Sequence, residues 1–440
     1  MRRFLRGWRS WIDVLFERSY RMKMGEIWQP GFNIFMVNEP QWVRRILVGN
    51  APDYPKHELM HRMLEPLLGS SIFTTNGEVW ARQRRLVDQA LGHARLKRVF
   101  PLMRDCVDDM LSRMDTKADG EPFDIDAEMT YVTADIIFRT ILSEKLSSTD
   151  AATIYEAFVE FQHHAQRSMM LSMYRLPSFL PRRASARSAV KIRAVLARLI
   201  AQRFEKRNAP EQPEDILSAL IAARDPHTGD GFGYEELVDQ VCMLFLAGHE
   251  TSASALGWSL YLTAQCGHMQ SRMLAEIDTE VGARPFEYGD PKALELTRDV
   301  FREALRLYPP VGFFVREALQ THCMRNKTVP KGSPLLISPW LIHRHQSLWE
   351  RPNEFDPDRF GTPAGKASLK CAYIPFSAGP RVCPGAAFAS QEAMLILASV
   401  VRRFTLAPVA ERVPKPVGRV TIRSENGIWI RLMRRPAEGR

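Results

Sequence analysis

The sequence contains no apolar run long enough to cross a membrane, because a transmembrane helix needs about 20 consecutive, predominantly apolar residues. Its basic start is not followed by an apolar segment with a cleavage site, which excludes a secretory signal peptide. We therefore expect a cytoplasmic protein without a transmembrane span.

Paired cysteines and linkers are also missing. The six cysteines form no Cys-x-x-Cys pair, which argues against a disulfide framework and a zinc site and suits a reducing compartment. The chain has no Gly/Ser tract, no low-complexity run and no repeat of fixed period, so nothing marks a boundary between domains. We expect residues 1–440 to form a single domain with one continuous core.

Acidic residues are fewer than basic ones, and the formal net charge is +10. Such an excess of positive charge attracts acidic partners. Basic side chains are dense in one segment, at Arg82, Arg84, Arg85, Arg95, Lys97 and Arg98. No nucleic-acid-binding motif accompanies them, so we expect an acidic protein partner and no nucleic acid. A solvated basic surface without a partner is the alternative.

Residues 1–25 combine apolar side chains at helical spacing with several arginines. A basic amphipathic helix of this kind either makes a peripheral contact with a membrane surface or packs its apolar stripe on the domain. We favour packing on the domain.

The apolar pattern is mostly helical, with short strand-like segments near both ends. The longest predicted helix covers about residues 234–266, contains no proline and is apolar nearly all round in its middle, as a buried helix should be. Strands are predicted at 34–37, 311–315 and 334–337. A late hairpin is predicted to turn at Asn426-Gly427.

Residues 376–385 read FSAGPRVCPG and frame one cysteine, Cys383. Gly379 and Gly385 allow the backbone to approach another group closely, because neither carries a Cβ. Arg381 supplies a fixed cation for a nearby anion. Thiolate is the form of cysteine that binds metal, and we expect this positive, amide-rich surrounding to lower the cysteine pKa.

The pattern Phe-x-x-Gly-x-Arg-x-Cys-x-Gly, which begins at Phe376, resembles the haem-binding loop of the cytochromes P-450 at every fixed position. The resemblance implies a mainly α fold with a smaller β part, in which a long central helix lies over haem. It implies haem b, iron protoporphyrin IX, with the Cys383 thiolate as axial iron ligand. Phe376, Gly379, Arg381 and Gly385 would contact the haem. A buried structural cysteine beside a Gly-Pro turn is the alternative.

The middle of the predicted central helix carries small residues, Ala247 and Gly248, followed by Glu250 and Thr251. A threonine hydroxyl can bond to the carbonyl one turn back and bend or widen the helix. The combination resembles the oxygen-binding groove of the same family. It implies that Thr251 steadies the oxygen ligand and that Glu250 connects it to solvent protons. A back-bonded threonine beside a surface glutamate is the alternative.

Haem carries two propionates, so its site needs cations. Trp80 and Arg84 lie one helical turn apart, and the resemblance assigns both, together with Arg316 and Arg381, to propionate contacts. For Trp80, core packing fits the sequence equally well.

Glu303 and Arg306 lie three residues apart on one predicted helix face. Alone, this spacing is common in solvated helix pairs. The family resemblance adds Arg359 and implies a buried charge cluster that locks the haem-side core without taking part in chemistry. Such a cluster must be well hydrogen-bonded to survive burial.

The substrate pocket is predicted from position in the family and from apolar composition. Its predicted residues are Leu244, Phe245, Val311, Phe313, Phe314 and Ile428. Nearby methionines adapt to irregular shapes, so a lipid, terpenoid, steroid or polyketide-like substrate is expected. For any single one of these residues, core packing is the alternative.

Together these motifs predict a haem-thiolate monooxygenase similar to soluble bacterial members of the family. It would use O2 as co-substrate and take two electrons from a ferredoxin or flavodoxin-type donor with its reductase. Because the chain ends soon after its last predicted strand, no fused reductase domain is expected. Alternatives are a peroxygenase or isomerase that needs no electron donor, which the acid–alcohol pair disfavours, and a non-catalytic haem sensor or carrier.

Overall fold

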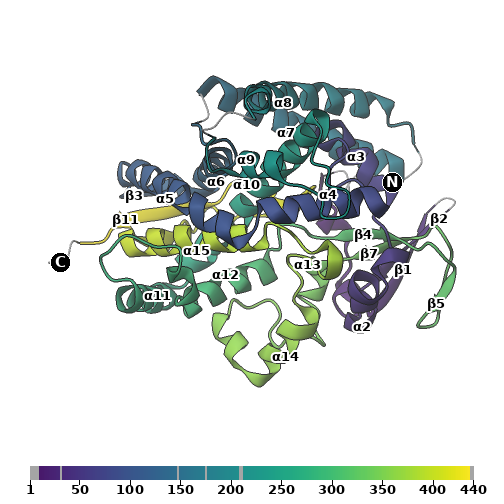
Figure 1. Cartoon of the computed structure of the whole chain (residues 1–440). Coiled ribbons are helices and arrows are strands. Elements are labelled where there is room, and N and C mark those ends of the chain that lie inside the picture. Colours follow the sequence, from purple (N-terminus) through teal and green to yellow (C-terminus); the bar gives the residue numbers. More distant parts are fainter. Residues whose placement is uncertain (1–8, 30–31, 146–147, 174–175, 208–211, 437–440) are drawn as a thin grey trace.

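The computed structural model describes residues 9–29, 32–145, 148–173, 176–207 and 212–436. Helices make up most of this part of the molecule, and the strands form small sheets toward its edges (Figure 1). The fold class predicted from the sequence, mainly α with a smaller β part, is confirmed.

The α-helices, in chain order, are α2 (Pro40–Arg44), α3 (Glu58–Leu68), α4 (Gly77–Ala90), α5 (His93–Asp115), α6 (Ile125–Leu142), α7 (Ser148–Met173), α8 (Phe179–Glu205), α9 (Ile216–Ala222), α10 (Tyr234–Ala264), α11 (Gly267–Glu280), α12 (Glu295–Leu307), α13 (Pro339–Ile342), α14 (Pro363–Ala372) and α15 (Ala386–Arg403). Single helical turns are η1 (Ile12–Val14), η2 (Glu17–Tyr20), η3 (Arg45–Gly49), η4 (Ala51–Asp53), η5 (Asp290–Lys292), η6 (Pro357–Gly361) and η7 (Gly379–Arg381).

The strands are β1 (Met24–Gln29), β2 (Phe32–Val37), β3 (Asp119–Asp124), β4 (Phe314–Glu317), β5 (His322–Met324), β6 (Lys327–Val329), β7 (Pro334–Ile337), β8 (Phe404–Pro408), β9 (Pro416–Gly418), β10 (Ile422–Ser424) and β11 (Trp429–Arg434). Within the described residues they form a sheet of order β1-β2-β7-β4, a sheet of order β3-β11-β8, and the pairs β5–β6 and β9–β10. The strands predicted at 34–37 and 334–337 fall in β2 and β7, and the one predicted at 311–315 overlaps only the first two residues of β4, which begins at Phe314. All three strands share the first sheet.

The predicted central helix is α10, whose 31 residues give a length of about 47 Å. Its first turn is capped by the Glu236 carboxylate, which accepts a hydrogen bond from the backbone N–H of Gly233 (3.4 Å). Helices α6, α8, α12 and α15 surround it, so most of its side chains are buried on every side. This burial explains why its apolar pattern lacks a polar face.

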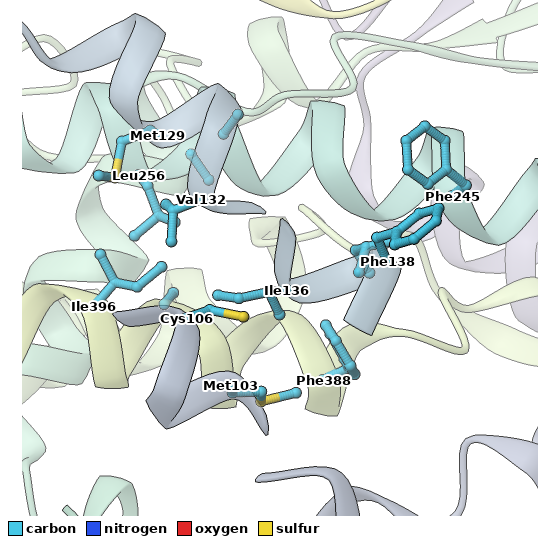
Figure 2. Close-up of a cluster of buried hydrophobic side chains, with 14 of the residues drawn as sticks. Met103, Cys106, Met129, Val132, Ile136, Phe138, Phe245, Leu256, Phe388 and Ile396 are labelled. Carbon is cyan, nitrogen blue, oxygen red and sulfur yellow. The ribbon is translucent and has the colours of Figure 1, made fainter. Parts of the chain in front are cut away.

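A core of aliphatic and sulfur-containing side chains fixes α10 against the segment that follows Cys383. Figure 2 shows Met103 of α5, Ile136 of α6, Leu256 of α10 and Ile396 of α15 meeting in this core. Full burial of each such side chain contributes about 1.5–3 kcal/mol. Because α15 begins three residues after Cys383, the same packing holds the cysteine loop in register with α10.

The N-terminal prediction needs correction. Residues 1–8 lie outside the described part of the chain. Beyond them, residues 9–25 form the turns η1 and η2 and the start of β1, not the continuous helix predicted for 1–25. The expected packing on the domain is present, because the Trp11 ring meets Phe313 edge to face with centroids 5.3 Å apart. Its indole N–H also donates to the carbonyl of Arg419 (3.1 Å).

The late hairpin was predicted at the wrong turn. Residues 422–424 of β10 pair with residues 416–418 of β9, so the hairpin turns at Arg419–Thr421 and not at Asn426-Gly427. Strand β11 instead pairs with β8 and β3, which are distant in the chain. Asn426-Gly427 has the composition of a hairpin turn, but long-range pairing decides the partner of β11.

Among the helices of the described chain, none is long and apolar enough to span a membrane.

Candidate active site

A cavity of about 340 Å³ lies between α10 and the cysteine loop, residues 376–385. It gathers side chains from segments that are more than 300 residues apart in the sequence. The predicted site residues that line it are Trp80, Arg84, Leu244, Ala247, Gly248, Glu250, Thr251, Val311, Phe313, Phe314, Arg316, Phe376, Arg381, Cys383 and Gly385. The cavity therefore unites the cysteine, the cations and the acid–alcohol pair in one place.

Two predicted pocket residues do not line this cavity. Phe245 follows Leu244 by one residue, which turns it about 100° around α10. It is 3% exposed and points toward Phe138 in the core (Figure 2). Ile428 is fully buried, and its Cδ1 lies 3.2 Å from where a Cβ on Gly257 would sit. In this structure both side chains pack in the core instead of lining the cavity.

The cysteine loop is held by left-handed backbone conformations and by contacts with the N-terminal part of the chain. Ser377 and Gly379 have φ values of 64° and 71°. A Cβ on Gly379 would lie 2.1 Å from the carbonyl oxygen of Leu47, so only glycine fits there. Gly379 does not itself line the cavity, and its role is to let the loop pass Leu47.

Cys383 projects its side chain into the cavity from the end of this loop. Its backbone N–H donates to the carbonyl of Phe376 (2.9 Å), which closes the loop. Burial raises the pKa of the Cys383 thiol, and the Gly385 backbone N–H and the Arg84 charge only partly oppose this. The predicted lowering of the pKa is therefore wrong for the protein alone, because desolvation of the thiolate outweighs the positive surrounding. A bound metal cation would reverse that balance, since coordination deprotonates a thiol.

Arg84 and Arg381 bring positive charge to the rim of the loop. Arg84 on α4 donates to the carbonyl of Val382 (2.6 Å) and pairs with Asp88 (2.8 Å). Arg381 donates to the carbonyl of Ala51 (2.8 Å), and its guanidinium carbon lies 5.1 Å from the centre of the Trp80 ring. Trp80 thus faces the cavity and the cations rather than serving only as core.

Arg316 and Lys56 are neighbours, because an isolated antiparallel bridge pairs their backbones. The Lys56 ammonium donates to the carbonyls of Ile72 and Thr75, at 2.6 Å each. Burial, together with repulsion from Arg381 and other arginines, lowers the pKa of Lys56 to about 6. Burial and the Arg381 charge lower the pKa of Arg316 to about 10. At neutral pH Arg316 and Arg381 therefore keep this wall of the cavity positive, whereas Lys56 is mostly neutral until an anion binds nearby.

These cations fit a doubly anionic ligand. In the part of the chain that the structure describes, no acidic side chain pairs with Lys56, Arg316 or Arg381, and the buried Arg381 Nε has no hydrogen-bond partner. Buried charges are normally paired or hydrogen-bonded. Two propionates would supply the missing negative charge, so the residues present fit the haem that the sequence implies.

Gly248 on α10 has a role in helix packing in addition to leaving room for a cofactor. A Cβ on Gly248 would lie 2.4 Å from Cδ1 of Ile137 on α6, so glycine allows the two helices to pack closely. The Thr251 hydroxyl lines the cavity and donates to the carbonyl of Ala247 (2.6 Å). It therefore back-bonds as the sequence suggests, at the point where α10 borders the cavity.

Glu250 is buried, which contradicts the alternative of a surface glutamate. Its Oε1 accepts hydrogen bonds from the hydroxyl of Thr421 (2.7 Å) and the amide of Gln162 (3.0 Å), and Arg423 Nε lies 3.9 Å away. Burial alone would favour the neutral acid. Arg423, His249 and the two hydrogen bonds nevertheless lower the pKa of Glu250. The side chain is thus an ionised group at the cavity wall.

The structure brings Glu303, Arg306 and Arg359 into one buried cluster behind the cavity. Glu303 accepts from Arg306 Nε, Arg306 Nη2 and Arg359 Nε, each at 2.8 Å. The remaining guanidinium N–H groups donate to backbone carbonyls, including those of His343 and Pro352 (2.9 and 2.6 Å). The cluster meets the hydrogen-bonding condition for burial. Its residues do not line the cavity, which agrees with a structural role.

Among the cavity residues that sequence reasoning missed are Lys56, Arg419 and Thr421. Lys56 is an isolated lysine after a proline, and no local pattern distinguishes it. Arg419 and Thr421 lie in the β9–β10 turn, whose position over the cavity follows from long-range pairing. A prediction of the β9–β10 hairpin would have pointed to Arg419 and Thr421, because both lie in its turn.

The sequence model of the family described as cytochrome P450 matches residues 14–429. Cyclooctatin synthase of Streptomyces melanosporofaciens is 33% identical over 379 residues, which cover 86% of this chain and 81% of that protein. Pentalenene oxygenase of Streptomyces avermitilis is 29% identical, with 90% and 87% covered. Taurochenodeoxycholic 6 alpha-hydroxylase of Sus scrofa is 28% identical, with 91% and 82% covered.

Among solved structures, the haem domain of cytochrome P450DA is similar to this chain with a TM-score of 0.82 and 24% sequence identity. The similarity covers 94% of this chain and 90% of that domain. At this level of identity, the likeness supports the fold.

Proposed function

Because the chain belongs to the cytochrome P450 family and is thus an oxidoreductase of the monooxygenase class, we propose that it hydroxylates or epoxidises an apolar organic molecule. In the overall reaction, one oxygen atom of O2 enters a C–H or C=C bond. The other atom leaves as water, with two electrons from a separate donor and two protons from solvent. The mainly apolar wall of the cavity supports a lipid, terpenoid, steroid or polyketide-like substrate.

The observation that carries this proposal is one cavity bordered by Cys383, by cations without acidic partners and by the pair Glu250-Thr251. Haem b would be held by the Cys383 sulfur as iron ligand and by propionate contacts to Arg84, Arg316 and Arg381. When bound, haem supplies the O2-activating iron chemistry, and a thiolate ligand favours O–O cleavage. Trp80 and Lys56, which was not predicted from the sequence, would complete the propionate end of the site.

The protein itself would deliver protons. The Glu250 carboxylate is held in the ionised state, so its Oε1 can accept a proton from solvent and pass it on. Thr251 stands next to it on α10, and its hydroxyl would turn from the Ala247 carbonyl to donate into the cavity. Thr421 and Gln162 orient the carboxylate during this transfer.

We propose a ferredoxin or flavodoxin with its reductase as electron donor. The predicted basic segment is less charged than its sequence suggests, because four of its six residues form ion pairs: Arg82 with Glu236, Arg84 with Asp88, Arg85 with Asp225 and Arg98 with Glu214. Exposed Lys97 is among the cations left to meet an acidic partner. A cytoplasmic location, with contact to a membrane surface through the N-terminal segment, stays a prediction that fractionation of expressing cells would test.

The first test is the difference spectrum of the dithionite-reduced protein with and without CO. A strongly red-shifted Soret band that disappears in Cys383→Ser supports thiolate ligation by Cys383. Purified protein without haem would overturn the proposal.

A second experiment separates the monooxygenase from its alternatives. With a reconstituted ferredoxin system, Thr251→Ala should form less product and more hydrogen peroxide for each NAD(P)H consumed. Unchanged coupling would refute the assigned role of Thr251. Turnover with hydrogen peroxide alone would indicate a peroxygenase, and CO binding without oxidation of any compound in an apolar library would indicate a sensor or carrier.

A further inference from the structure

The cavity contains one cation that the haem does not explain. Arg419, in the β9–β10 turn, lines the same cavity as Cys383. Its backbone is fixed, because its N–H donates to the carbonyl of Thr421 (3.0 Å) and its own carbonyl accepts from the Trp11 indole (3.1 Å). For its guanidinium, the structure shows no hydrogen bond or ion pair with any described residue.

Other basic side chains lie near Arg419. His163 on α7 has its pKa lowered by burial and then by the charges of Arg167 and Arg419, which places the three groups near one another. Among the described residues that line the cavity, the acidic side chain is Glu250, and that carboxylate already accepts from Thr421 and Gln162. A guanidinium that borders an apolar cavity without an acidic partner is suited to bind an anion.

This anion site is distinct from the propionate end of the cavity. Lys56 and Arg381 both lie over the Trp80 ring, and a backbone bridge pairs Lys56 with Arg316, so these basic residues gather beside Trp80. The two haem propionates therefore find their partners at that end. Arg419 belongs instead to the turn that also carries Thr421, beside α7 and Glu250. The ligand that reaches it must be one other than the haem.

We propose that the substrate is an apolar carboxylic acid, whose carboxylate binds Arg419 while its hydrocarbon part lies against Leu244 and Val311 and extends toward Cys383. This rests on the proposed monooxygenase function and narrows its substrate class. A guanidinium binds a carboxylate through two parallel N–H···O bonds, which fixes orientation as well as affinity. Oxidation is therefore expected at a carbon remote from the carboxyl group, because that group is held at the Arg419 end.

The test compares binding of acids with binding of their neutral methyl esters. Equilibrium dialysis of the haem-containing protein would use radiolabelled dodecanoic, hexadecanoic and abietic acids and the three methyl esters. We expect at least one acid to bind the unmodified protein about tenfold more tightly than its ester, which corresponds to about 1.4 kcal/mol. Arg419→Gln should reduce the affinity for this acid to that for its ester and leave the ester unchanged.

Two further variants control the comparison. Arg419→Lys should keep part of the acid preference, because it retains the charge and loses the bidentate geometry. Arg412→Gln removes an exposed arginine that stacks on Trp429 outside the cavity wall, and it should leave the preference intact. Equal binding of acids and esters, or an acid preference that survives Arg419→Gln, would overturn the inference. Binding of a neutral terpene or steroid with no binding of any acid would do the same.

The assay also separates this inference from the proposed function. Dialysis measures binding without electron transfer, so acid binding through Arg419 without oxidised product would refute the monooxygenase proposal alone. Conversely, oxidation of neutral compounds with no preference for acids would refute the carboxylate site alone.

Discussion

Replacement of Glu303 by glutamine should destabilise the protein far more than any exchange of an exposed carboxylate. The Glu303 side chain is fully buried and accepts four hydrogen bonds, three from Arg306 and Arg359 and one from the backbone N–H of Asp356 (3.0 Å). Glutamine has nearly the same shape but no charge, so both guanidinium groups stay buried without their counterion. Breaking a buried ion pair in this way costs about 3–5 kcal/mol.

The same helix provides a matched control. Glu295 and Arg298 of α12 have the same three-residue spacing as Glu303 and Arg306, but the Glu295 side chain is 78% exposed. An exposed pair contributes about 0–1 kcal/mol, so Glu295→Gln should have a small effect. Urea unfolding followed by circular dichroism would give both free energies of unfolding from their midpoints and slopes. A loss for Glu303→Gln no larger than that for Glu295→Gln would refute the role assigned to the cluster.

Three further perturbations test other parts of the site. Gly248→Ala should destabilise by about 1–3 kcal/mol through its clash with Ile137, and Ile137→Val should restore part of this loss in urea unfolding of the double variant. Burial lowers the pKa of His343 to about 3, so between pH 3 and 6.5 the unfolded chain binds the extra proton. His343 alone should therefore lower the free energy of unfolding by up to about 1.4 kcal/mol per unit as the pH drops below 6.5. His343→Gln should flatten this slope between pH 6.5 and 5.0, and equal slopes would contradict the reasoning. Arg316→Met should speed haem transfer to apomyoglobin about tenfold through loss of a charge-assisted bond, whereas an unchanged rate would argue against a propionate contact.

Most of the site could be predicted from motifs whose residues are close in sequence. The loop around Cys383, the Glu250-Thr251 step and the i,i+3 pair Glu303–Arg306 each carry their chemistry within a few positions. Such local geometry depends on backbone conformation and helical spacing, which the residue types themselves determine. The long buried helix α10 was predicted for the same reason, because its apolar composition has no polar face.

Predictions failed where distance in the sequence or rotation around a helix mattered. Phe245 and Leu244 are adjacent, yet only Leu244 reaches the cavity, and the register of α10 against its neighbours decides between them. Strand β11, which follows the turn signal at Asn426-Gly427, pairs with β3 and β8, two strands that are distant in the sequence. The pKa of Cys383 depends on burial, a property of the whole fold.

The sequence by itself determined the family, the cysteine loop, the acid–alcohol pair and the charge cluster, because each is a short pattern of residue types with a direct chemical meaning. Only the tertiary structure placed Lys56 beside Arg316, and brought Arg419 of the β9–β10 turn to the same cavity. Neither residue belongs to a local motif. Their role depends on which segments meet across the folded chain, and on whether burial leaves a charge without a partner.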